Sequence, residues 1–441
     1  MKENKEITIV IDFRIYYYLF ELVIGQFVKR GVKVHLACNA EIRQFITEQS
    51  KDLKGIEFVD LPAIKKSYRI HQALHRTLGI LFTRRDYSFQ YAKRINQVTV
   101  KAHGKKKFLY AISKFSPKVA NKRINSLLHF CTGLISSNPF RTKTVMVGSL
   151  NASPELICAK DMRVVTLMES WDHPVKVPNG YKSDKVIVWN NELKEDWIQN
   201  QYDENVEAVY PLKLRYAIET IKKQNVWAKR NDERDKPLCV YAVASTRVFS
   251  VPQIVEIERR LIADLCKATE KAGWDLLIKP RPHGDIREFD EFLKRYSHVS
   301  QGHMTDAAQD PADYYLNDDY NAKRFSQVLP AKLVINCFTT FGLDAAVAGI
   351  PVLQLDLRET DGYQDSQLFY SNHHINKYLI SGRSTLQVPP GSNVVEYIAR
   401  YLNNSQGLEN LYTQSICDWL IPAQSLDESL DTIVNIAMDE N

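Results

Sequence analysis

Three side chains that can bind an anion follow one apolar segment of the chain within five residues. The segment Trp274–Lys279 leads into a loop with the sequence KPRPHGD, which holds Lys279, Arg281 and His283. Two prolines remove backbone donors from this loop, so its side chains must do any binding. Lysine and arginine both bind phosphate, arginine in bidentate fashion. The loop predicts a phosphate or diphosphate site, against the alternative of a rigid surface loop with solvated charges.

A second cluster follows another apolar segment about sixty residues later. After Asn336 come the hydroxyls of Thr339 and Thr340, a glycine and a small-residue helical stretch that contains Asp344. Backbone N–H groups at a helix start, together with threonine hydroxyls, favour an anion site, and Asp344 could accept a hydrogen bond from a ribose hydroxyl. The alternative is helix capping by Thr339 or Thr340. Both clusters should line one edge of one sheet.

Short polar loops also follow the leading strand of each half of the chain. In the second half the loop holds Ser245, Thr246 and Arg247, and in the first half the matching loop holds Asp12 and Arg14. We expect the two loops to face each other across a cleft between domains. For Asp12 the competing interpretation is helix N-capping.

A fourth cluster could supply a general base. Glu169, Trp171, Asp172 and His173 follow an apolar strand-like run, and carboxylates or histidine in that position can take a proton. Trp171 could stack on a sugar or fill the core. Among Asp172, Glu169 and Asp12, we favour Asp172 as the base, because Asp12 has the capping alternative and Glu169 could orient the other carboxylate.

Several other chemistries lose support. There is no H-E-x-x-H or C-x-x-C motif, and no metal site is expected. G-x-S-x-G, Walker A and G-x-G-x-x-G motifs are also missing, which argues against hydrolases, NTPases and Rossmann dehydrogenases. Seven scattered cysteines favour a reducing compartment over a disulfide framework.

The elements that must position these side chains alternate between apolar strand-like runs and helical stretches. Such alternation predicts open parallel α/β sheets. A polar, charged connection at 218–237 separates two halves, 1–217 and 238–441. The expected strands are Ile7–Asp12, Val32–Cys38, Thr144–Val147, Arg163–Leu167, Lys185–Trp189, Leu238–Ala244, Trp274–Lys279, Leu333–Asn336 and Val352–Leu355, and the expected helices are Tyr17–Arg30 (ended by Gly31), Glu192–Gln201, Ile254–Ala272 and Leu343–Ala348.

Charge is concentrated in one stretch. The chain carries +6 overall, but residues 62–125 hold sixteen Lys and Arg and one acid, Asp86, interleaved with aromatic residues. Such a stretch can bind nucleic acid or an anionic bilayer, and an enzyme acting on a membrane-held acceptor explains it best. No run is apolar enough to span a membrane, and no signal peptide is expected. We therefore expect a cytoplasmic protein, peripheral on the inner face of the membrane.

These motifs resemble a known family. The KPRPH loop, the TTFGLDAAVAGIPV segment, the run from Glu169 to Asp172 and the VIVWN strand end are similar to glycosyltransferases of the two-Rossmann-domain (GT-B) fold. The likeness is to bacterial capsule and lipopolysaccharide enzymes, including CMP-2-keto-sugar transferases and CDP-glycerol glycerophosphotransferase-like proteins. It implies an α/β fold of two Rossmann-like domains facing across a cleft.

The resemblance also implies roles. The first domain, with the basic insertion, would bind the acceptor through Arg14, Trp171 and His173. The second, whose last helix can cross back, would bind the donor. The donor-binding residues would be Lys279, Arg281, His283, Thr339, Thr340, Asp344, Ser245, Thr246 and Arg247.

The expected function is metal-independent transfer of a sugar from a nucleotide donor to a lipid-linked surface-glycan acceptor. No cofactor is expected, and a CMP-linked donor is weakly favoured. One alternative is a CDP-polyol phosphotransferase of teichoic-acid type, which would use the same cationic loop. An alternative of another class is a non-catalytic nucleic-acid-binding protein that uses residues 62–125; on the favoured interpretation no nucleic acid is bound.

Overall fold

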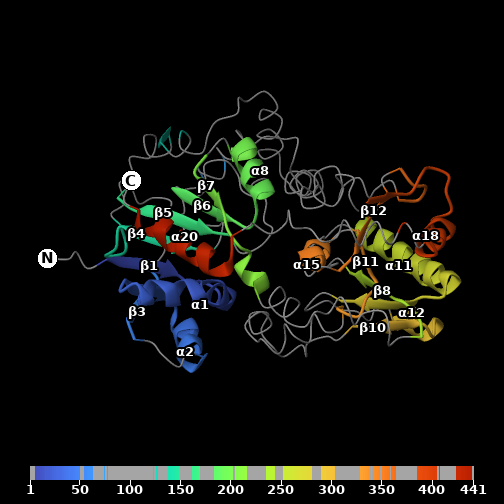
Figure 1. Cartoon of the computed structure of the whole chain (residues 1–441), viewed down its shortest axis with the longest axis horizontal. Helices are drawn as coiled ribbons and strands as arrows, with labels where there is room; N and C mark the ends of the chain where they lie inside the picture. Colours follow the sequence, from blue (N-terminus) through green and yellow to red (C-terminus); the bar gives the residue numbers. More distant parts are fainter. Residues whose placement is uncertain are drawn as a thin grey trace. The chain divides into compact units, whose positions relative to one another are not determined.

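The chain forms two compact α/β units. The first comprises Met1–Lys213 and Trp419–Asn441, and the second Leu214–Asp418. Figure 1 shows the elements of both. The computed structural model describes residues 5–49, 54–62, 74, 77, 123, 126–127, 138–148, 161–168, 183–201, 204–215, 235–243, 252–280, 290–302, 328–337, 339, 341–347, 350–357, 359–363, 385–404, 407 and 424–439.

The first unit is built on a parallel seven-stranded sheet. Its strand order is β3-β2-β1-β4-β5-β6-β7. The central strands are buried, β-branched runs, as expected of a parallel sheet covered on both faces. The strands are β1 (Glu6–Val10), β2 (Lys33–Cys38), β3 (Ile56–Asp60), β4 (Thr144–Val147), β5 (Arg163–Leu167), β6 (Lys185–Val188) and β7 (Val206–Ala208).

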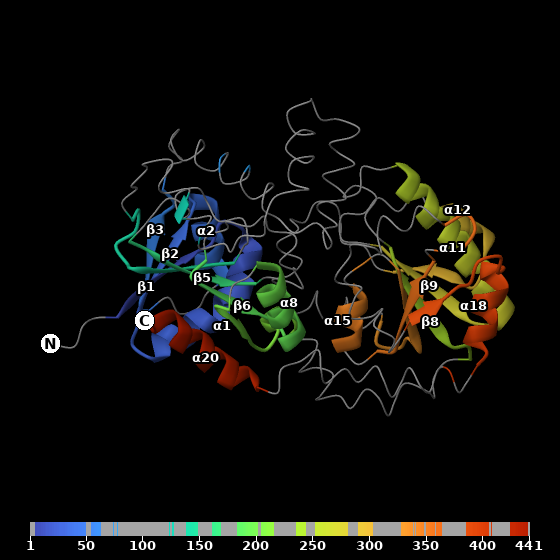
Figure 2. The same cartoon turned by 90° about the horizontal axis from the view of Figure 1, so that it is seen from above.

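Helices from both ends of the chain pack on this sheet. They are α1 (Arg14–Lys29), α2 (Ala40–Gln49), α8 (Asn191–Gln201) and α20 (Leu426–Met438), with a 3₁₀ turn at Leu212–Leu214. In Figures 1 and 2, α20 lies beside α1, and it also contacts β4.

Polar contacts attach α20 to the first unit. Gln26 of α1 and Arg30, the C-cap of that helix, each donate to Asp431, at 2.5 Å. Arg163 donates to the carbonyls of Ile436, at 2.7 Å, and Asp439, so a cation meets the negative end of the helix. The other end of α20 has a capping box between Ser425 and Glu428.

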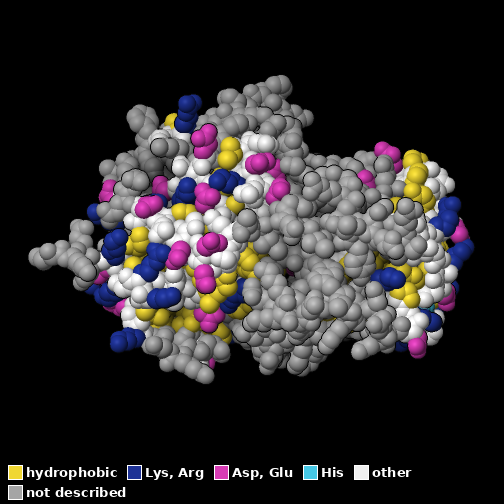
Figure 3. All heavy atoms as spheres, viewed as in Figure 1, with side chains coloured by type: hydrophobic (Ala, Val, Ile, Leu, Met, Phe, Trp, Pro, Cys, Tyr) yellow, Lys and Arg dark blue, Asp and Glu magenta, His cyan; other side chains and the backbone are white. Residues whose placement is uncertain are grey.

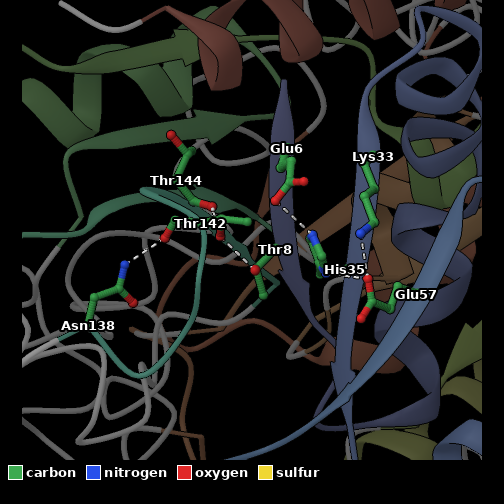
Figure 4. A network of polar contacts seen from close by, with 8 residues as sticks. All are labelled: Glu6, Thr8, Lys33, His35, Glu57, Asn138, Thr142 and Thr144. Carbon is green, nitrogen blue, oxygen red and sulfur yellow. Dashed lines mark hydrogen bonds and ion pairs between the residues drawn. The ribbon is translucent and has the colours of Figure 1, made fainter. Parts of the chain in front are cut away.

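A second polar network holds β1 at its amino-terminal end (Figure 4). The His35 imidazole of β2 is 5% exposed and lies 3.2 Å from Glu6 of β1 and 3.5 Å from Glu57 of β3. On the other flank, Thr8 shares a 2.7 Å hydrogen bond with Thr142, just before β4. Side-chain bonds therefore link β1 to neighbours on both sides.

The second unit is a parallel six-stranded sheet with the order β10-β9-β8-β11-β12-β13. In sequence order this is third, second, first, fourth, fifth, sixth, the doubly-wound Rossmann order. The strands are β8 (Leu238–Ala242), β9 (Asp275–Lys279), β10 (Val299–Gln301), β11 (Leu333–Asn336), β12 (Val352–Asp356) and β13 (Thr385–Gln387), and the helices are α11 (Pro252–Ala272), α12 (Asp290–Arg295), α15 (Phe341–Val347) and α18 (Val394–Leu402).

The strand orders confirm the predicted fold class. Both sheets are parallel and begin third-second-first-fourth, so the chain consists of two Rossmann-like domains, as in GT-B proteins. Every strand and helix expected from the sequence is present, within about two residues at most ends. Of the expected connection at 218–237, residues 218–234 lie outside the described part.

The described surface mixes its charges. On the face seen in Figure 3, basic and acidic side chains of the first unit are interspersed. The basic stretch 62–125 lies outside the described residues except for positions 62, 74, 77 and 123. Among the described helices, none is both long and apolar enough to cross a membrane.

Candidate functional site

The second unit places a buried cation at the carboxyl edge of its sheet. Lys279 is the last residue of β9 and is 7% exposed. Its Nζ lies 4.6 Å from the ring centre of Phe341, the first residue of α15, a cation–π contact in a desolvated setting. Because β9 and β11 flank β8, this contact spans the end of β8. The structure therefore brings the strand before the basic loop and the helix after Thr340 together.

A buried amide pair fixes the loop between β11 and α15. Asn336 and Gln354 are aligned on neighbouring strands and both are fully buried. Asn336 Nδ2 donates to Gln354 Oε1 at 2.6 Å, and Gln354 Nε2 donates to the Cys337 carbonyl at 3.0 Å. The pair therefore holds both the end of β11 and the first residue of the loop.

Thr339 continues this network toward α15. Its Oγ1 donates to Asn336 Oδ1 at 2.7 Å and accepts from the Phe341 N–H at 3.3 Å. Thr339 therefore binds the N–H of the first residue of α15 from one position before the N-cap, and so helps to fix the helix start. The hydroxyl hydrogen of Thr339 is used in the bond to Asn336. In this arrangement Thr339 therefore stabilises the loop between β11 and α15.

The loop after β12 is also held in place. Thr360 Oγ1 donates to the Val388 carbonyl, and Arg260 of α11 donates to the Gly362 carbonyl, each at 2.8 Å. Tyr363 donates to Asp264 Oδ2 at 2.8 Å; burial first, then the Asp264 carboxylate, raises the pKa of Tyr363, so the phenol stays protonated. Gly362 adopts a φ of +79° that favours glycine.

The strand ends around β8 form the switch point of the second sheet, where strand order reverses and open α/β folds bind ligands. Lys279, Asn336 and Thr339 all belong to strands or loops at this place. Asp344 lies half-buried within α15, one turn from its start, as the sequence indicated. Sequence reasoning missed Asn336 and Gln354 as site residues; two amides within apolar strands were the available signal.

The equivalent switch point of the first sheet lies between β1 and β4. Asp12 is half-buried just after β1. The N-cap of α1 is Phe13, with extended φ and ψ of −136° and 146°, so Asp12 lies one residue before the cap position that was its competing interpretation.

Two further residues shape this switch point. Gly148 follows β4, and a Cβ there would lie 2.6 Å from a ring carbon of Tyr16, so only glycine lets the ring pack this closely. Arg14, an expected acceptor-binding residue, forms an ion pair with Glu41 at 2.9 Å and lies over the Phe45 ring at 5.1 Å. Arg14 is thus anchored to α2.

The remaining predicted site residues lie outside the described part of the chain. They are Glu169, Trp171, Asp172, His173, Ser245, Thr246, Arg247, Arg281, His283 and Thr340. Among the residues that the structure describes, no three histidine, cysteine or acidic side chains gather as metal ligands would. The described cysteines, Cys38, Cys239, Cys266 and Cys337, are buried free thiols.

Comparison with known proteins yields structural likenesses. No family model and no curated protein matches the chain. A Rickettsia africae glycosyltransferase is 10% identical, with 99% of this chain and 98% of that one covered and a TM-score of 0.44. The UDP-GlcNAc 2-epimerase of Neisseria meningitidis, bound to UDP-GlcNAc, is 12% identical, with 98% and 99% covered and a TM-score of 0.47.

A third similar structure is a variant of the wall teichoic acid polymerase TagF. It is 11% identical, with 99% of this chain and 89% of that one covered, and the TM-score is 0.43. The strand orders of the two sheets, rather than these likenesses, establish the fold described above.

Proposed function

We propose that this chain is a metal-independent GT-B glycosyltransferase that moves a sugar from a nucleotide donor to a lipid-linked acceptor of a bacterial surface glycan, capsule or lipopolysaccharide. The observation that carries the proposal is Lys279, a nearly buried ammonium at the switch point of the second sheet. A cation held at the ligand-binding edge of an open α/β sheet can offset the charge of a bound phosphate. A nucleotide phosphate is such a ligand.

The chemistry follows from the site. As the glycosidic bond to the phosphate breaks, negative charge develops on the leaving phosphate oxygen, and Lys279 with Arg281 and His283 of the adjoining loop would offset it. The proton on the acceptor hydroxyl would pass to a carboxylate of the first unit, Asp12, Glu169 or Asp172. The basic stretch 62–125 would hold the enzyme at the anionic membrane surface that carries the acceptor.

A thermal-shift panel of UDP, CDP, GDP, CMP and their sugar conjugates tests the donor assignment. A ligand at 100 times its Kd should add about 2.7 kcal/mol of stability, and we expect CMP compounds to give the largest shift. Absence of any shift at millimolar concentrations would remove the nucleotide-donor assignment.

Product analysis and metal removal test the type of reaction and its independence of metal ions. Activity should persist in EDTA; loss of activity with rescue by Mg²⁺ or Mn²⁺ would contradict the metal-free mechanism. The CDP-polyol phosphotransferase alternative predicts a product that keeps phosphate, with release of CMP, which mass spectrometry detects. Binding of random-sequence RNA at physiological salt more tightly than micromolar would instead favour the nucleic-acid-binding alternative.

A further inference from the structure

We propose that Phe13 is a stacking platform for a pyranose ring of the acceptor glycan, at the switch point of the first sheet. The identity of the ligand rests on the function proposed above; the platform rests on the structure of the first unit alone. The Phe13 side chain is 61% exposed, the most exposed large apolar side chain among the described residues. It lies between the end of β1 and the start of α1, where open α/β sheets bind ligands.

Phe13 also occupies a position that its side chain suits poorly. It is the N-cap of α1, where Ser, Thr, Asp and Asn are preferred because they bond the free N–H groups of the first turn. The helix start has no side-chain capping bond. A residue that exposes apolar surface and supplies no side-chain cap of its own works against stability, and such local conflicts concentrate at functional sites.

The neighbours of Phe13 support the ring from one side. Tyr16, one turn into α1, is 6% exposed and packs over Gly148 so closely that a Cβ would not fit. The Phe13 and Tyr16 ring centres are 5.8 Å apart with an interplanar angle of 74°. In an edge-to-face pair, the edge of one ring meets one face of the other, so at least one face of Phe13 is left uncovered by Tyr16.

A sugar ring fits this surface chemically. A pyranose presents a face of C–H groups, with slight positive charge, that complements the negative face of an aromatic ring. Its hydroxyls remain at the rim, where polar groups give orientation, as is usual in ligand sites. The half-buried carboxylate of Asp12 is the preceding residue, so a sugar on Phe13 would bring a hydroxyl near a candidate base.

The test uses the full chain and four variants. Phe13→Trp keeps the aromatic face, Phe13→Leu keeps only apolar character, and Phe13→Ser removes the ring while adding a preferred cap. Phe58→Leu is the control: Phe58 is an aromatic residue of β3 in the same unit, and its ring packs against Arg43 of α2. The probes are the methyl pyranosides of glucose, galactose, mannose and N-acetylglucosamine, measured by saturation-transfer NMR.

We expect wild type and Phe13→Trp to transfer saturation to the C–H protons on one face of at least one glycoside. Phe13→Leu and Phe13→Ser should weaken binding about 3- to 10-fold, and Phe58→Leu should leave it unchanged. Phe13→Ser should also raise the Tm of the first unit by about 2–4 °C, since it caps α1. Weaker binding with a higher Tm rules out misfolding as the cause.

Three results would overturn the proposal: no transfer to any glycoside with wild type, an unchanged signal with Phe13→Ser, or loss of binding only with Phe58→Leu. If Phe13→Ser instead releases the protein from phosphatidylglycerol vesicles and keeps the glycoside signal, the ring is a membrane contact and the proposal is wrong. If sugars bind but the nucleotide panel gives no shift, the platform stands and the glycosyltransferase proposal fails.

Discussion

The two switch points share a topology and differ in almost everything else. Both lie where the first strand of a sheet meets the fourth, β1 beside β4 and β8 beside β11. In the first unit the strand ends carry a half-buried carboxylate and an exposed aromatic ring, Asp12 and Phe13. In the second, a buried ammonium, Lys279, ends the neighbouring strand β9, and the fully buried amide pair Asn336 and Gln354 lies on β11 and β12. The same strand order thus supports an acidic site with an exposed aromatic ring in one unit and a buried cationic site in the other.

The difference fits the two ligands that we propose for the two units. A charged ligand gains most from donors fixed in advance in a desolvated site, and the second unit fixes its loops with hydrogen bonds from Gln354, Asn336 and Thr339. A neutral sugar gains more from exposed aromatic surface with a few polar groups.

The largest effect tests the first switch point. If Asp12 is the general base, Asp12→Asn should lower kcat roughly 10²- to 10⁴-fold while nucleotide affinity stays constant. Asp60→Asn is the matched control, because Asp60 ends β3 of the same sheet and is exposed. Steady-state kinetics and isothermal titration measure the two quantities. If Asp12→Asn is fully active while Asp172→Asn is not, the base is Asp172 and the first switch point only positions the acceptor.

The second effect tests the buried cation. Lys279→Met keeps an apolar stem against Phe341 and removes the charge, so nucleotide affinity should fall about 10- to 100-fold. Lys332→Met is the control, because Lys332 makes a similar cation–π contact with Trp274 at 5.9 Å, just before β11 and β9 begin. Titration calorimetry with the nucleotide of greatest thermal shift measures both. Equal affinity for the two variants would contradict the assignment.

A third and smaller effect tests whether the amide pair positions the second site. Gln354→Leu leaves a buried Asn336 N–H without its acceptor and should cost about 1–3 kcal/mol of unfolding free energy. Hydrogen exchange should rise across residues 337–347, and nucleotide affinity should fall. Thr269→Val removes a buried hydroxyl bonded within α11, before β9 begins. Thr269→Val should lower the unfolding free energy by a similar amount without changing nucleotide affinity. If Thr269→Val lowers nucleotide affinity as much as Gln354→Leu does, the amide pair has only a structural role.

The smallest effect concerns the attachment of α20 to the first unit. Hydrogen bonds from Gln26 and then Arg30 lower the pKa of Asp431 below its usual 3.8. Because the folded pKa lies below the unfolded one, this contribution is present above the unfolded pKa and is lost as pH falls through the folded value. The Tm of the first unit should therefore fall between about pH 5 and pH 3, and Asp431→Asn should flatten that decline in calorimetry. If the Tm values of wild type and Asp431→Asn fall in parallel as the pH is lowered, Asp431 does not contribute to the pH dependence of stability.

The fold could be predicted because the central strands of both sheets are apolar runs that are visible in the sequence. Runs such as Thr144–Val147 and Leu333–Asn336 match their strands fully, since a strand buried on both faces must be apolar throughout. The strands at the sheet edges were not predicted from the sequence. β3 is only half-buried, and β7 and β10 have three residues each, so no hydrophobic run marks them.

The site was predictable only in part. The expected meeting of the Lys279 and Thr339 segments followed from their places after parallel strands, and the structure has it. The role of Asp12 did not follow, because an N-cap preference cannot tell which of two neighbouring residues takes the cap, and the fold gives it to Phe13. The amide pair could not be predicted, because Asn336 and Gln354 meet only in the register of β11 and β12, and no local sequence pattern specifies that register.

The return of α20 to the first unit has a consequence for synthesis on the ribosome. The strands of the first unit are complete by Ala208, yet α20 follows roughly two hundred residues after Lys213, or about 10–40 s later at usual elongation rates. During that interval the surface of α1 and β4 that α20 covers has no partner from its own chain. A nascent chain stalled before Ser425 should therefore be a better chaperone client than one that has released α20.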